Sequence, residues 1–487
     1  MNNWSWQIEN KEYLKKTIER CKKQKILLPK FSEMKNPETI PQKIQNKLQN
    51  VGMQETNPFN LFRINWNNDS KTGKIGGINF LEIPKEISGV KARIIGLIGK
   101  FFPTGAHKVG ASYGCLAPYL VTGKFNPEYH KAVWPSTGNY CRGGIFNSRL
   151  LSVHGVAILP EEMSKERFDW LKEMGAEIYA TPGCESNVKE IYDKCHELER
   201  KSDEYIIFNQ FDQFGNAIWH YTVTGHTIEK LFNQLKKENQ RVSGYVSATG
   251  SAGTIGAGDY LRELYPQIKV VASEALQCPT LLMNGYGGHR IEGIGDKHVP
   301  WIHNVKNTDA VAAINDEDPL KILRLFNEPE GQKYLKQLGI DDTTLSKLSW
   351  LGISGISNML SAVKLAKHFE MNENDVIFTI FTDSVELYNS RLEEMNQTWG
   401  KYSLHQAEID WYSIIQRQGI DYFAELNYQE KKRIHNLKYF TWVEQQCKTV
   451  EELNAQWYDE NYWKVRFEIV KYWDELIDDF NKQVALD

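Results

Sequence analysis

The distribution of apolar and polar residues divides the chain into three parts. Residues 1–75 are mostly polar, with a helical pattern over residues 11–25 before a Pro- and Asn-rich stretch. From residue 76, short β-branched and aromatic runs alternate with amphipathic stretches, which indicates strands joined by helices. Beyond about residue 391 these runs stop, and tryptophans recur at helical spacing among charged residues. We therefore expect an N-terminal extension, an α/β core and a helical C-terminal extension.

The core pattern predicts strands at residues 92–102, 131–135, 155–160, 176–180, 205–208, 243–248, 268–273 and 375–381. It predicts helices at residues 162–174, 187–200, 218–236, 254–264, 318–336 and 356–368. Strands joined by helices of this length imply parallel sheets with right-handed crossovers. A glycine-rich passage at residues 275–312 shows no such pattern, and a long irregular segment inside a compact domain is more often functional than idle.

Four segments follow from this division. We expect an N-terminal extension over residues 1–75, one lobe over 76–225 and a second lobe over 226–395. The aromatic-rich C-terminal extension covers residues 396–487. Its tryptophans fit a cap on the core or a dimer interface better than a separate ligand site, because such anchors are typical of interfaces.

Composition excludes several classes of protein. The 487 residues are 41% hydrophobic and 25% charged, and the net charge of −4 gives no general reason to expect nucleic-acid binding. No apolar run reaches the length of about 18 residues needed to span a membrane, and no signal peptide is visible. The seven cysteines are scattered and never spaced Cys-x-x-Cys. This indicates reduced thiols in a cytoplasm, with no disulfide framework and no metal site.

One lysine occupies a position where α/β folds bind ligands. The apolar run 92–102 is broken by Pro103, Thr104 and Gly105, and Lys108 then opens a segment rich in small residues. Such a strand-to-helix turn lies at the carboxyl edge of a parallel sheet. A buried amine there has a lowered pKa and can add to a carbonyl group. The alternative is a solvated lysine at a helix start.

A glycine-rich turn supplies a second feature. It separates the strand at 243–248 from the next helix, so free backbone N–H groups and the helix dipole favour a phosphate there. The turn matches neither the common ATP-binding loop nor a clean dinucleotide fingerprint, and many such turns bind nothing. The residues expected to hold phosphate are Gly250, Ser251, Ala252, Gly253 and Thr254.

Two polar turns complete the set. Ser136, Thr137, Gly138, Asn139 and Tyr140 follow a short strand and suit a bound carboxylate, although Ser, Thr and Asn are also ordinary helix caps. Residues 382–384, Thr-Asp-Ser, end the last strand, where a hydroxyl can meet a ring edge or cap the next helix. An amine, a phosphate turn, a carboxylate turn and a hydroxyl together match the needs of pyridoxal 5′-phosphate.

On these motifs the core, over roughly residues 76–391, resembles the β-family (fold type II) of pyridoxal-phosphate enzymes. That group includes O-acetylserine sulfhydrylase (cysteine synthase), cystathionine β-synthase and the tryptophan synthase β subunit. Residues 104–108 resemble the lysine motif, 136–139 the asparagine loop, 250–254 the phosphate loop, and 383–385 the Asp-Ser-Val of cystathionine β-synthase. The resemblance implies two doubly wound lobes with the cofactor in the cleft between them.

The resemblance also implies individual roles. Lys108 would hold the cofactor and Asn139 would bond its phenolic oxygen, while Ser384 would meet the pyridine nitrogen. The loop from Ser136 to Tyr140, together with Gln210 in its Phe-Asn-Gln-Phe context, would bind the substrate carboxylate. Lys108 and Ser384 are thus the expected catalytic residues.

The expected reaction is β-elimination or β-replacement on a serine- or cysteine-type amino acid through an aminoacrylate, with a thiol or other nucleophile as second substrate. A neutral hydroxyl such as Ser384 favours prompt loss of a β-leaving group over transamination. The alternatives are a serine/threonine-type ammonia-lyase and, from another class, a non-catalytic subunit on the same scaffold. Relatives of this kind are commonly dimers, so we expect a cytoplasmic homodimer.

Overall fold

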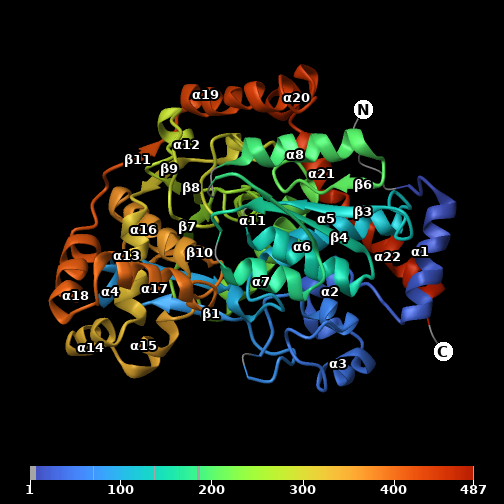
Figure 1. Cartoon of the computed structure of the whole chain (residues 1–487). Coiled ribbons are helices and arrows are strands. Elements are labelled where there is room, and N and C mark those ends of the chain that lie inside the picture. Colours follow the sequence, from blue (N-terminus) through green and yellow to red (C-terminus); the bar gives the residue numbers. More distant parts are fainter. Residues whose placement is uncertain (1–6, 70, 137, 164, 184–186, 486–487) are drawn as a thin grey trace.

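Two β-sheets organise the chain in the computed structural model, which describes residues 7–69, 71–136, 138–163, 165–183 and 187–485 (Figure 1). The smaller sheet has four parallel strands in the order β5-β4-β3-β6. Their bounds are β3 Lys131–Pro135, β4 His154–Pro160, β5 Glu177–Thr181 and β6 Tyr205–Ile207. The expected strand at 131–135 is confirmed with the same bounds, and the other three agree within two residues.

Alternation along β3 explains how this sheet is covered on both faces. Ala132 and Trp134 join the apolar cluster that also contains Ile145 of α6 (Asn139–Leu150). Val133, between them, packs instead with Ile191 of α8 (Val188–Lys201). Because successive side chains of a strand point to opposite faces, one short run buries apolar surface on both sides.

The larger sheet has seven strands in the order β1-β2-β10-β7-β8-β9-β11. Their bounds are β1 Phe80–Ile83, β2 Arg93–Ile98, β7 Arg241–Ala248, β8 Lys269–Ala275, β9 Ala310–Ile314, β10 Asp375–Phe381 and β11 Phe423–Glu425. β2, β10, β7, β8 and β9 run parallel, whereas β1 and β11 pair antiparallel at the two edges. The strand β2, which leads to Lys108, thus pairs with β10 in this sheet, although it lies in the segment 76–225 assigned above to the other lobe.

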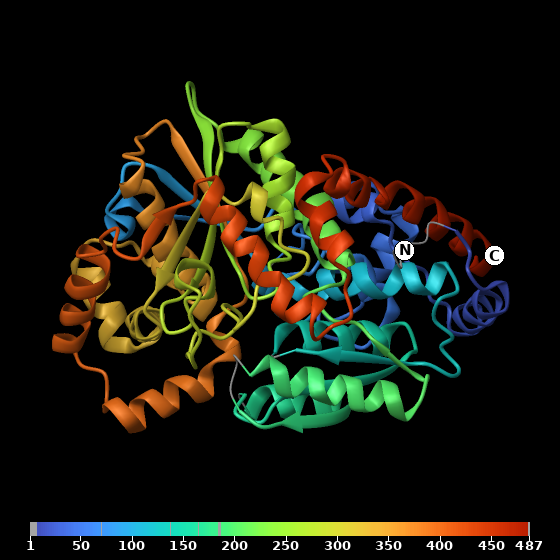
Figure 2. The same ribbon diagram turned by 90° about the horizontal axis from the view of Figure 1, so that it is seen from above.

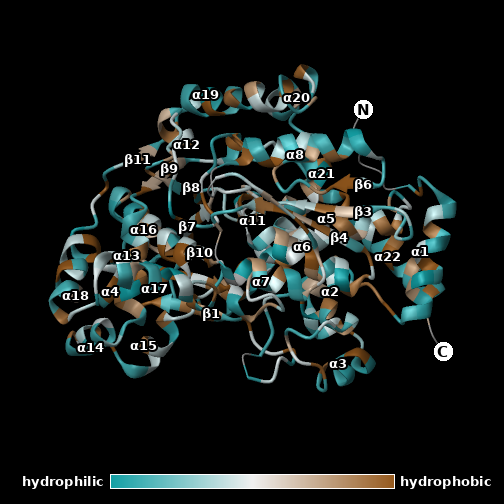
Figure 3. Cartoon of the chain, viewed as in Figure 1, coloured by the Kyte–Doolittle hydropathy of each residue, from teal (hydrophilic) through white to brown (hydrophobic). Residues whose placement is uncertain are grey.

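Helices cover both faces of the larger sheet. α16 (Ile353–His368) packs on β10 and β7 from one side, and α10 (His226–Leu235) and α11 (Ile255–Leu264) contribute to the cluster on the other. The apolar colouring in Figure 3 is concentrated on the strands, and the outer helices show alternating polar stripes. This is the doubly wound arrangement that the family resemblance implies.

Three expectations about secondary structure were wrong. The passage 275–312 was expected to be irregular, but it contains α12 (Thr280–Met283) and the start of β9. The strands do not stop at residue 391, because β11 lies beyond it. The predicted helix at 318–336 is two helices, α13 (Glu317–Asn327) and α14 (Pro329–Gln337), since a proline has no N–H to continue a helix and is favoured in its first turn.

The expected helix at residues 218–236 begins earlier, at Phe214. It consists of α9 (Phe214–Trp219), a π-helical segment His220–Gly225 and α10. Wide turns of this kind are rare and often found at functional sites. This segment brings His220 against His107, with ring centroids 5.1 Å apart.

The remaining helices are α5, which is buried along almost its whole length, and those of the outer parts. They are α1 Lys11–Gln24, α2 Phe31–Lys35, α3 Gln42–Leu48, α4 Lys85–Ser88, α5 Lys108–Val121, α7 Lys165–Glu173, α15 Asp342–Leu348, α17 Asn389–Trp399, α18 Leu404–Asp410, α19 Tyr428–Lys438, α20 Val450–Tyr458, α21 Tyr462–Glu468 and α22 Val470–Val484. Figure 2 shows the C-terminal segment, orange to red, passing from beside the larger sheet to the dark-blue helix α1 near the N-terminus. No helix in the described ranges has both the length and the apolar character needed to cross a membrane.

Both extensions pack on the core. α1 and α22 lie side by side, and Asn481 exchanges hydrogen bonds with the backbone of Leu28 at 2.9 and 2.7 Å. Lys438 at the end of α19 is fully buried and donates to the carbonyl oxygens of Trp301 and His303 and to the Gln456 side chain. A buried ammonium is tolerated only when its donors are satisfied, so these bonds fix the C-terminal extension to the loop before β9.

Candidate active site

Lys108 is the first residue of α5 and its amine reaches into the space between the two lobes. The chain leaves β2 at Ile98 and turns through residues 99–107, where Gly105 has a φ of +74° that few other residues adopt. The Lys108 Nζ donates to Ser251 Oγ over 2.7 Å and to Gln210 Oε1 over 3.2 Å. The amine therefore meets the glycine-rich turn and the loop after β6 at one point.

The turn between β7 and α11 is shaped for an anion. A Cβ at position 253 would lie only 2.0 Å from the Asn216 side-chain oxygen, so glycine is required there. Asn216 Nδ2 also donates to Ser251 Oγ over 3.0 Å. Within the described chain, the N–H groups of Ser251, Ala252 and Thr254 donate to no acceptor. Free donors at the start of a helix are what a phosphate group needs.

The loop after β3 faces the same space. Ser136 Oγ accepts hydrogen bonds from Gly138 N at 3.1 Å and from Gln210 Nε2 at 3.2 Å. Asn139 Nδ2 donates to Asp383 over 2.6 Å, while its buried Oδ1 has no hydrogen-bond partner. Thr137, also expected to bind substrate, lies outside the described residues. An unpartnered amide oxygen in a polar pocket indicates a missing ligand contact.

A narrow cavity joins these groups. It is lined by His107, Lys108, Ser136, Asn139, Tyr140, Arg167, Gln210, Gly250, Ser251, Gly293, Asp296, Ser354 and Thr382. Of the residues expected from the sequence, it brings together the lysine, the first two residues of the phosphate turn, the glutamine and much of the substrate loop. Ala252, Gly253 and Thr254 lie behind that lining, where Thr254 Oγ1 is bonded to Ser247 Oγ at 2.6 Å.

Ser384 follows β10 but does not line this cavity in the described chain, whereas Thr382 does. Thr382 Oγ1 lies 2.6 Å from Ser354 Oγ at the start of α16. Asp383, which lies between Thr382 and Ser384 in the sequence, accepts a hydrogen bond from Tyr388 at 2.7 Å and another from Asn139. Burial raises the pKa of Asp383. The cavity wall beside β10 therefore carries the Thr382 and Ser354 hydroxyls, while the Asp383 carboxyl group, which is not part of the lining, accepts hydrogen bonds from Asn139 and Tyr388.

His107 immediately precedes the lysine and is neutral. Its Nδ1 lies 3.2 Å from the Thr382 carbonyl oxygen, so this nitrogen carries the proton, and its buried Nε2 has no partner. Burial, and then the charge of Lys108, lower the pKa of His107 to about 3. Its ring stacks on Trp66 with centroids 6.0 Å apart. The histidine thus holds the turn before Lys108 against β10 without adding charge.

Arg167 was not identified from the sequence. It extends from α7 into the cavity lining, is 4% exposed at its side chain and pairs with Glu292 at 2.8 Å. Glu292 also accepts from Arg391 at 2.8 Å. Nothing in the sequence marks Arg167, because it lies within a helix where charged residues are ordinarily exposed. Thr382 and Ser354 have the clearer signal of a hydroxyl at an element end.

These residues fit a pyridoxal 5′-phosphate group. The fit rests on a lysine amine beside the free N–H groups of the Ser251 turn, and on the unpartnered Asn139 oxygen. In the described part of the chain, no three histidine, cysteine or acidic residues gather to bind a metal. The six described cysteines are free thiols.

Residues 100–332 match the family model of pyridoxal-phosphate dependent enzymes. The chain is 30% identical over 232 residues to a probable cysteine synthase of Bacillus subtilis, covering 47% of this chain and 73% of that protein. It is 25% identical over 323 residues to a cysteine synthase of Staphylococcus aureus, covering 66% and 96%. The structure of O-acetyl serine sulfhydrylase isoform 3 from Entamoeba histolytica has a TM-score of 0.57 at 24% identity, covering 70% of this chain and 94% of its own. That last likeness concerns the fold.

Proposed function

Because the chain belongs to the pyridoxal-phosphate-dependent enzymes, we propose that it catalyses β-elimination or β-replacement on a serine- or cysteine-type amino acid. The observation that carries this proposal is the 2.7 Å contact between the Lys108 amine and Ser251 of the phosphate turn. The cysteine synthases among its relatives support the choice of substrate class. When bound, the cofactor supplies an electron sink for the carbanion formed at the substrate Cα.

Lys108 has two roles in this proposal. Its Nζ would hold the cofactor at its aldehyde group, and the same amine would act as the base that removes the proton from the substrate Cα. Positioning the base at the reacting carbon gives a general-base advantage of about 10²–10⁴-fold. Gln210 and Ser251, the two hydrogen-bond partners of this amine, orient it toward the cavity.

The remaining residues bind the anionic groups. The turn from Gly250 to Thr254 holds the phosphate through backbone N–H groups, and Ser136, Thr137, Gly138, Asn139, Tyr140 and Gln210 form the carboxylate site. The unpartnered Asn139 oxygen and the Gln210–Ser136 bond support this assignment. We propose Ser384 as the neutral partner of the ring nitrogen, with Thr382, on the cavity wall, as the competing hydroxyl.

Product analysis tests the proposal. The protein, purified with its cofactor, is given serine, O-acetylserine or cysteine with and without added sulfide or a thiol. We expect a new sulfur-containing amino acid in the presence of the nucleophile. Keto acid and ammonia alone, whatever the nucleophile, would make the chain an ammonia-lyase. A protein that binds no cofactor would mean a non-catalytic subunit.

We also propose that the protein is a homodimer in the cytoplasm. Each chain would consist of the segments 1–75, 76–225, 226–395 and 396–487. The free thiols of the six described cysteines support a reducing compartment. The C-terminal extension exposes large aromatic side chains, which supports an interface there. These are Tyr428, Tyr439, Phe440, Tyr458 and Tyr472. Light scattering of the purified protein should give twice the chain mass of 56.3 kDa.

A further inference from the structure

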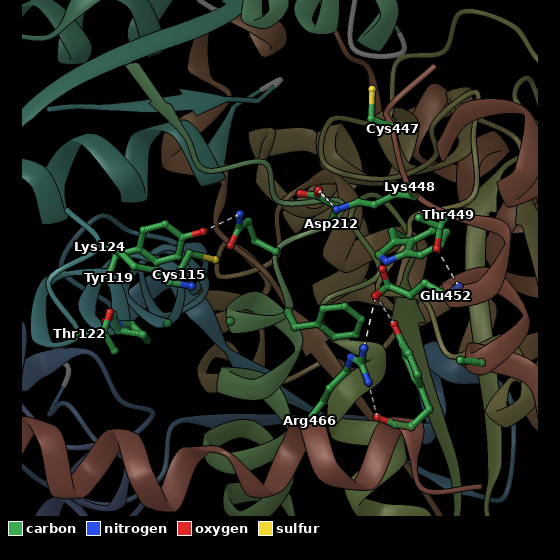
Figure 4. A pocket seen from close by; sticks show the side chains of 18 of the residues that line it. Cys115, Tyr119, Thr122, Lys124, Asp212, Cys447, Lys448, Thr449, Glu452 and Arg466 are labelled. Atoms are coloured by element: carbon green, nitrogen blue, oxygen red, sulfur yellow. Dashed lines mark hydrogen bonds and ion pairs between the residues drawn. The ribbon is translucent and has the colours of Figure 1, made fainter. Parts of the chain in front are cut away.

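A second cavity, of about 550 Å³ (Figure 4), shares no lining residue with the cavity of the candidate active site in the described chain. One wall is α5 from Gly114 onward, with the segment that leads into α9. The opposite wall comes from the C-terminal extension, chiefly α20 and α21. Its volume falls within the range of about 300–1,000 Å³ typical of small-molecule sites. The family model ends at residue 332, so the C-terminal wall is outside the matched region.

Charges of both signs face this cavity. Lys448 pairs with Asp212 at 2.7 Å, and Arg466 pairs with Glu452 at 3.3 Å (Figure 4). Tyr462 also donates to Glu452, over 2.9 Å. The side chains of Lys448, Asp212 and Glu452 remain 26%, 18% and 21% exposed. These side chains are partly buried, and a ligand in the cavity could still reach them.

This lining restricts the chemistry of an occupant. A purely apolar ligand would strip water from two ion pairs without replacing its hydrogen bonds, which is unfavourable. A phosphorylated ligand is disfavoured because carboxylates outnumber cations in the lining. The carboxylates are Asp212, Glu451, Glu452 and Asp459, and the cations are Lys124, Lys448 and Arg466. A small zwitterion fits this lining better, because its anionic group can face the cations and its cationic group can face the carboxylates.

The cavity also touches both elements that position the catalytic amine. α5 begins at Lys108 and lines the cavity with Cys115 and Tyr119. Asp212 follows Gln210, the partner of Lys108, by two residues in the same loop. An occupant would therefore contact the helix that carries the amine and the loop that orients it.

We propose that this second cavity binds a free α-amino acid, with its carboxylate toward Lys448 and Arg466 and its ammonium group toward Asp212 and Glu452. Such a ligand would be an effector, because it reaches the surroundings of Lys108 without entering the active site. The proposal concerns a site distinct from the one that binds substrate and holds for any reaction at Lys108.

Cys447 provides a local readout at the rim of this cavity. It is exposed, whereas the other five described cysteines are buried. The holoenzyme is alkylated in the presence of each protein amino acid at millimolar concentration, except cysteine, whose own thiol would consume the reagent. Modification of the Cys447 peptide is followed by mass spectrometry. We expect at least one amino acid to slow this reaction several-fold. Its decarboxylated amine, its deaminated acid and inorganic phosphate should each fail to do so.

Variants separate this site from the active site. Ala455→Trp fills the cavity and should abolish protection while the visible absorption of the bound cofactor is retained. Asn454→Trp, on the exposed side of the same helix, is the matched control and should keep protection. If Ala455→Trp does not fold, Lys448→Gln should weaken protection several-fold. The proposal is overturned if no amino acid protects Cys447, if a single-charge analogue protects equally, or if protection survives in the folded Ala455→Trp variant.

Discussion

The Lys108 amine donates a hydrogen bond of 2.7 Å to Ser251, although 143 positions separate the two residues in the chain. Lys108 begins α5, which follows β2, and Ser251 precedes α11, which follows β7. β2 and β7 both flank β10 in the same parallel arrangement, so their carboxyl ends reach one edge of the sheet. The contact between amine and phosphate turn is thus a consequence of sheet topology.

Replacement of Lys108 by alanine removes the amine proposed both to hold the cofactor and to act as the base. We expect turnover to fall at least about a hundredfold and the visible absorption of the lysine-bound cofactor to disappear. Absorption spectra and product formation measure the two effects. Lys100→Ala, in the same connection but paired with Glu386, should preserve both. Retained absorption and activity in Lys108→Ala would refute the assignment.

Replacement of Ser251 by alanine removes the hydroxyl that accepts from Lys108 and from Asn216. One neutral hydrogen bond is worth about 0.5–1.5 kcal/mol, so we expect cofactor affinity to fall by about two- to twelvefold. Equilibrium titration of the cofactor into the cofactor-free protein measures this affinity. Ser243→Ala, at the other end of β7, should leave the affinity unchanged; an equal loss in both variants would mean a general structural effect.

Glu292 connects the two lobes at the cavity through Arg167 and Arg391. The Glu292 and Arg167 side chains are each only 4% exposed, and removing one member of a buried pair costs about 3–5 kcal/mol. We expect Glu292→Gln to lower the free energy of unfolding by up to that amount, measured by urea denaturation. Glu394→Gln removes a more exposed partner of Arg391 and should cost less than about 1 kcal/mol. Equal losses would contradict the buried-pair interpretation.

The sequence was most informative where one strand buries both faces. β10 reads Asp-Val-Ile-Phe-Thr-Ile-Phe and was predicted with its observed bounds, because a central parallel strand is apolar throughout. β9, Ala-Val-Ala-Ala-Ile, is dominated by alanine, which has no strand preference. β11 has three residues, none of them fully buried, and exists because β9 offers it an edge. Such edge pairing depends on tertiary structure and leaves no periodic signal.

At the candidate active site, too, residues with a local sequence pattern were predicted and residues placed by tertiary contacts were not. Lys108 and the turn at Gly250 were visible because each interrupts an apolar run with small residues. Arg167 was not, because only the docking of α7 against the passage containing Glu292 buries it. The roles of Asn139, Gln210 and Ser384 remain predictions.

Ser384 and Thr382 are the two hydroxyls proposed above to meet the ring nitrogen of the cofactor. Ser384→Asp would place a carboxylate there, which holds a proton on the nitrogen and should slow elimination and increase transamination. If Ser384 is the partner of the ring nitrogen, Thr382→Val should leave the ratio of elimination to transamination nearly unchanged. The change should be smaller than the several-fold effect expected from the loss of one hydrogen bond. The ratio of elimination to transamination products measures it. A change in Thr382→Val with none in Ser384→Asp would assign the role to Thr382, which lines the cavity.

The neutral state of His107 predicts a dependence of stability on pH. Its pKa falls from an ordinary value of about 6.5 to about 3 on folding, because of burial and the nearby Lys108 charge. The facing His220 is also buried with a lowered pKa, so it adds no positive charge to this contact. The stability contributed by neutral His107 is therefore complete above the unfolded pKa and is lost as the pH falls toward the folded value.

We expect wild type to lose stability more steeply than His107→Asn between about pH 6.5 and about pH 4, by up to about 1.4 kcal/mol per pH unit. Urea unfolding at a series of pH values measures the two slopes. His405→Asn, which changes an exposed histidine on α18, is the control and should keep the wild-type slope. Equal slopes in wild type and His107→Asn would mean that His107 binds its proton in the folded chain, and the proposed anchoring of the Lys108 turn by a neutral imidazole would then fail.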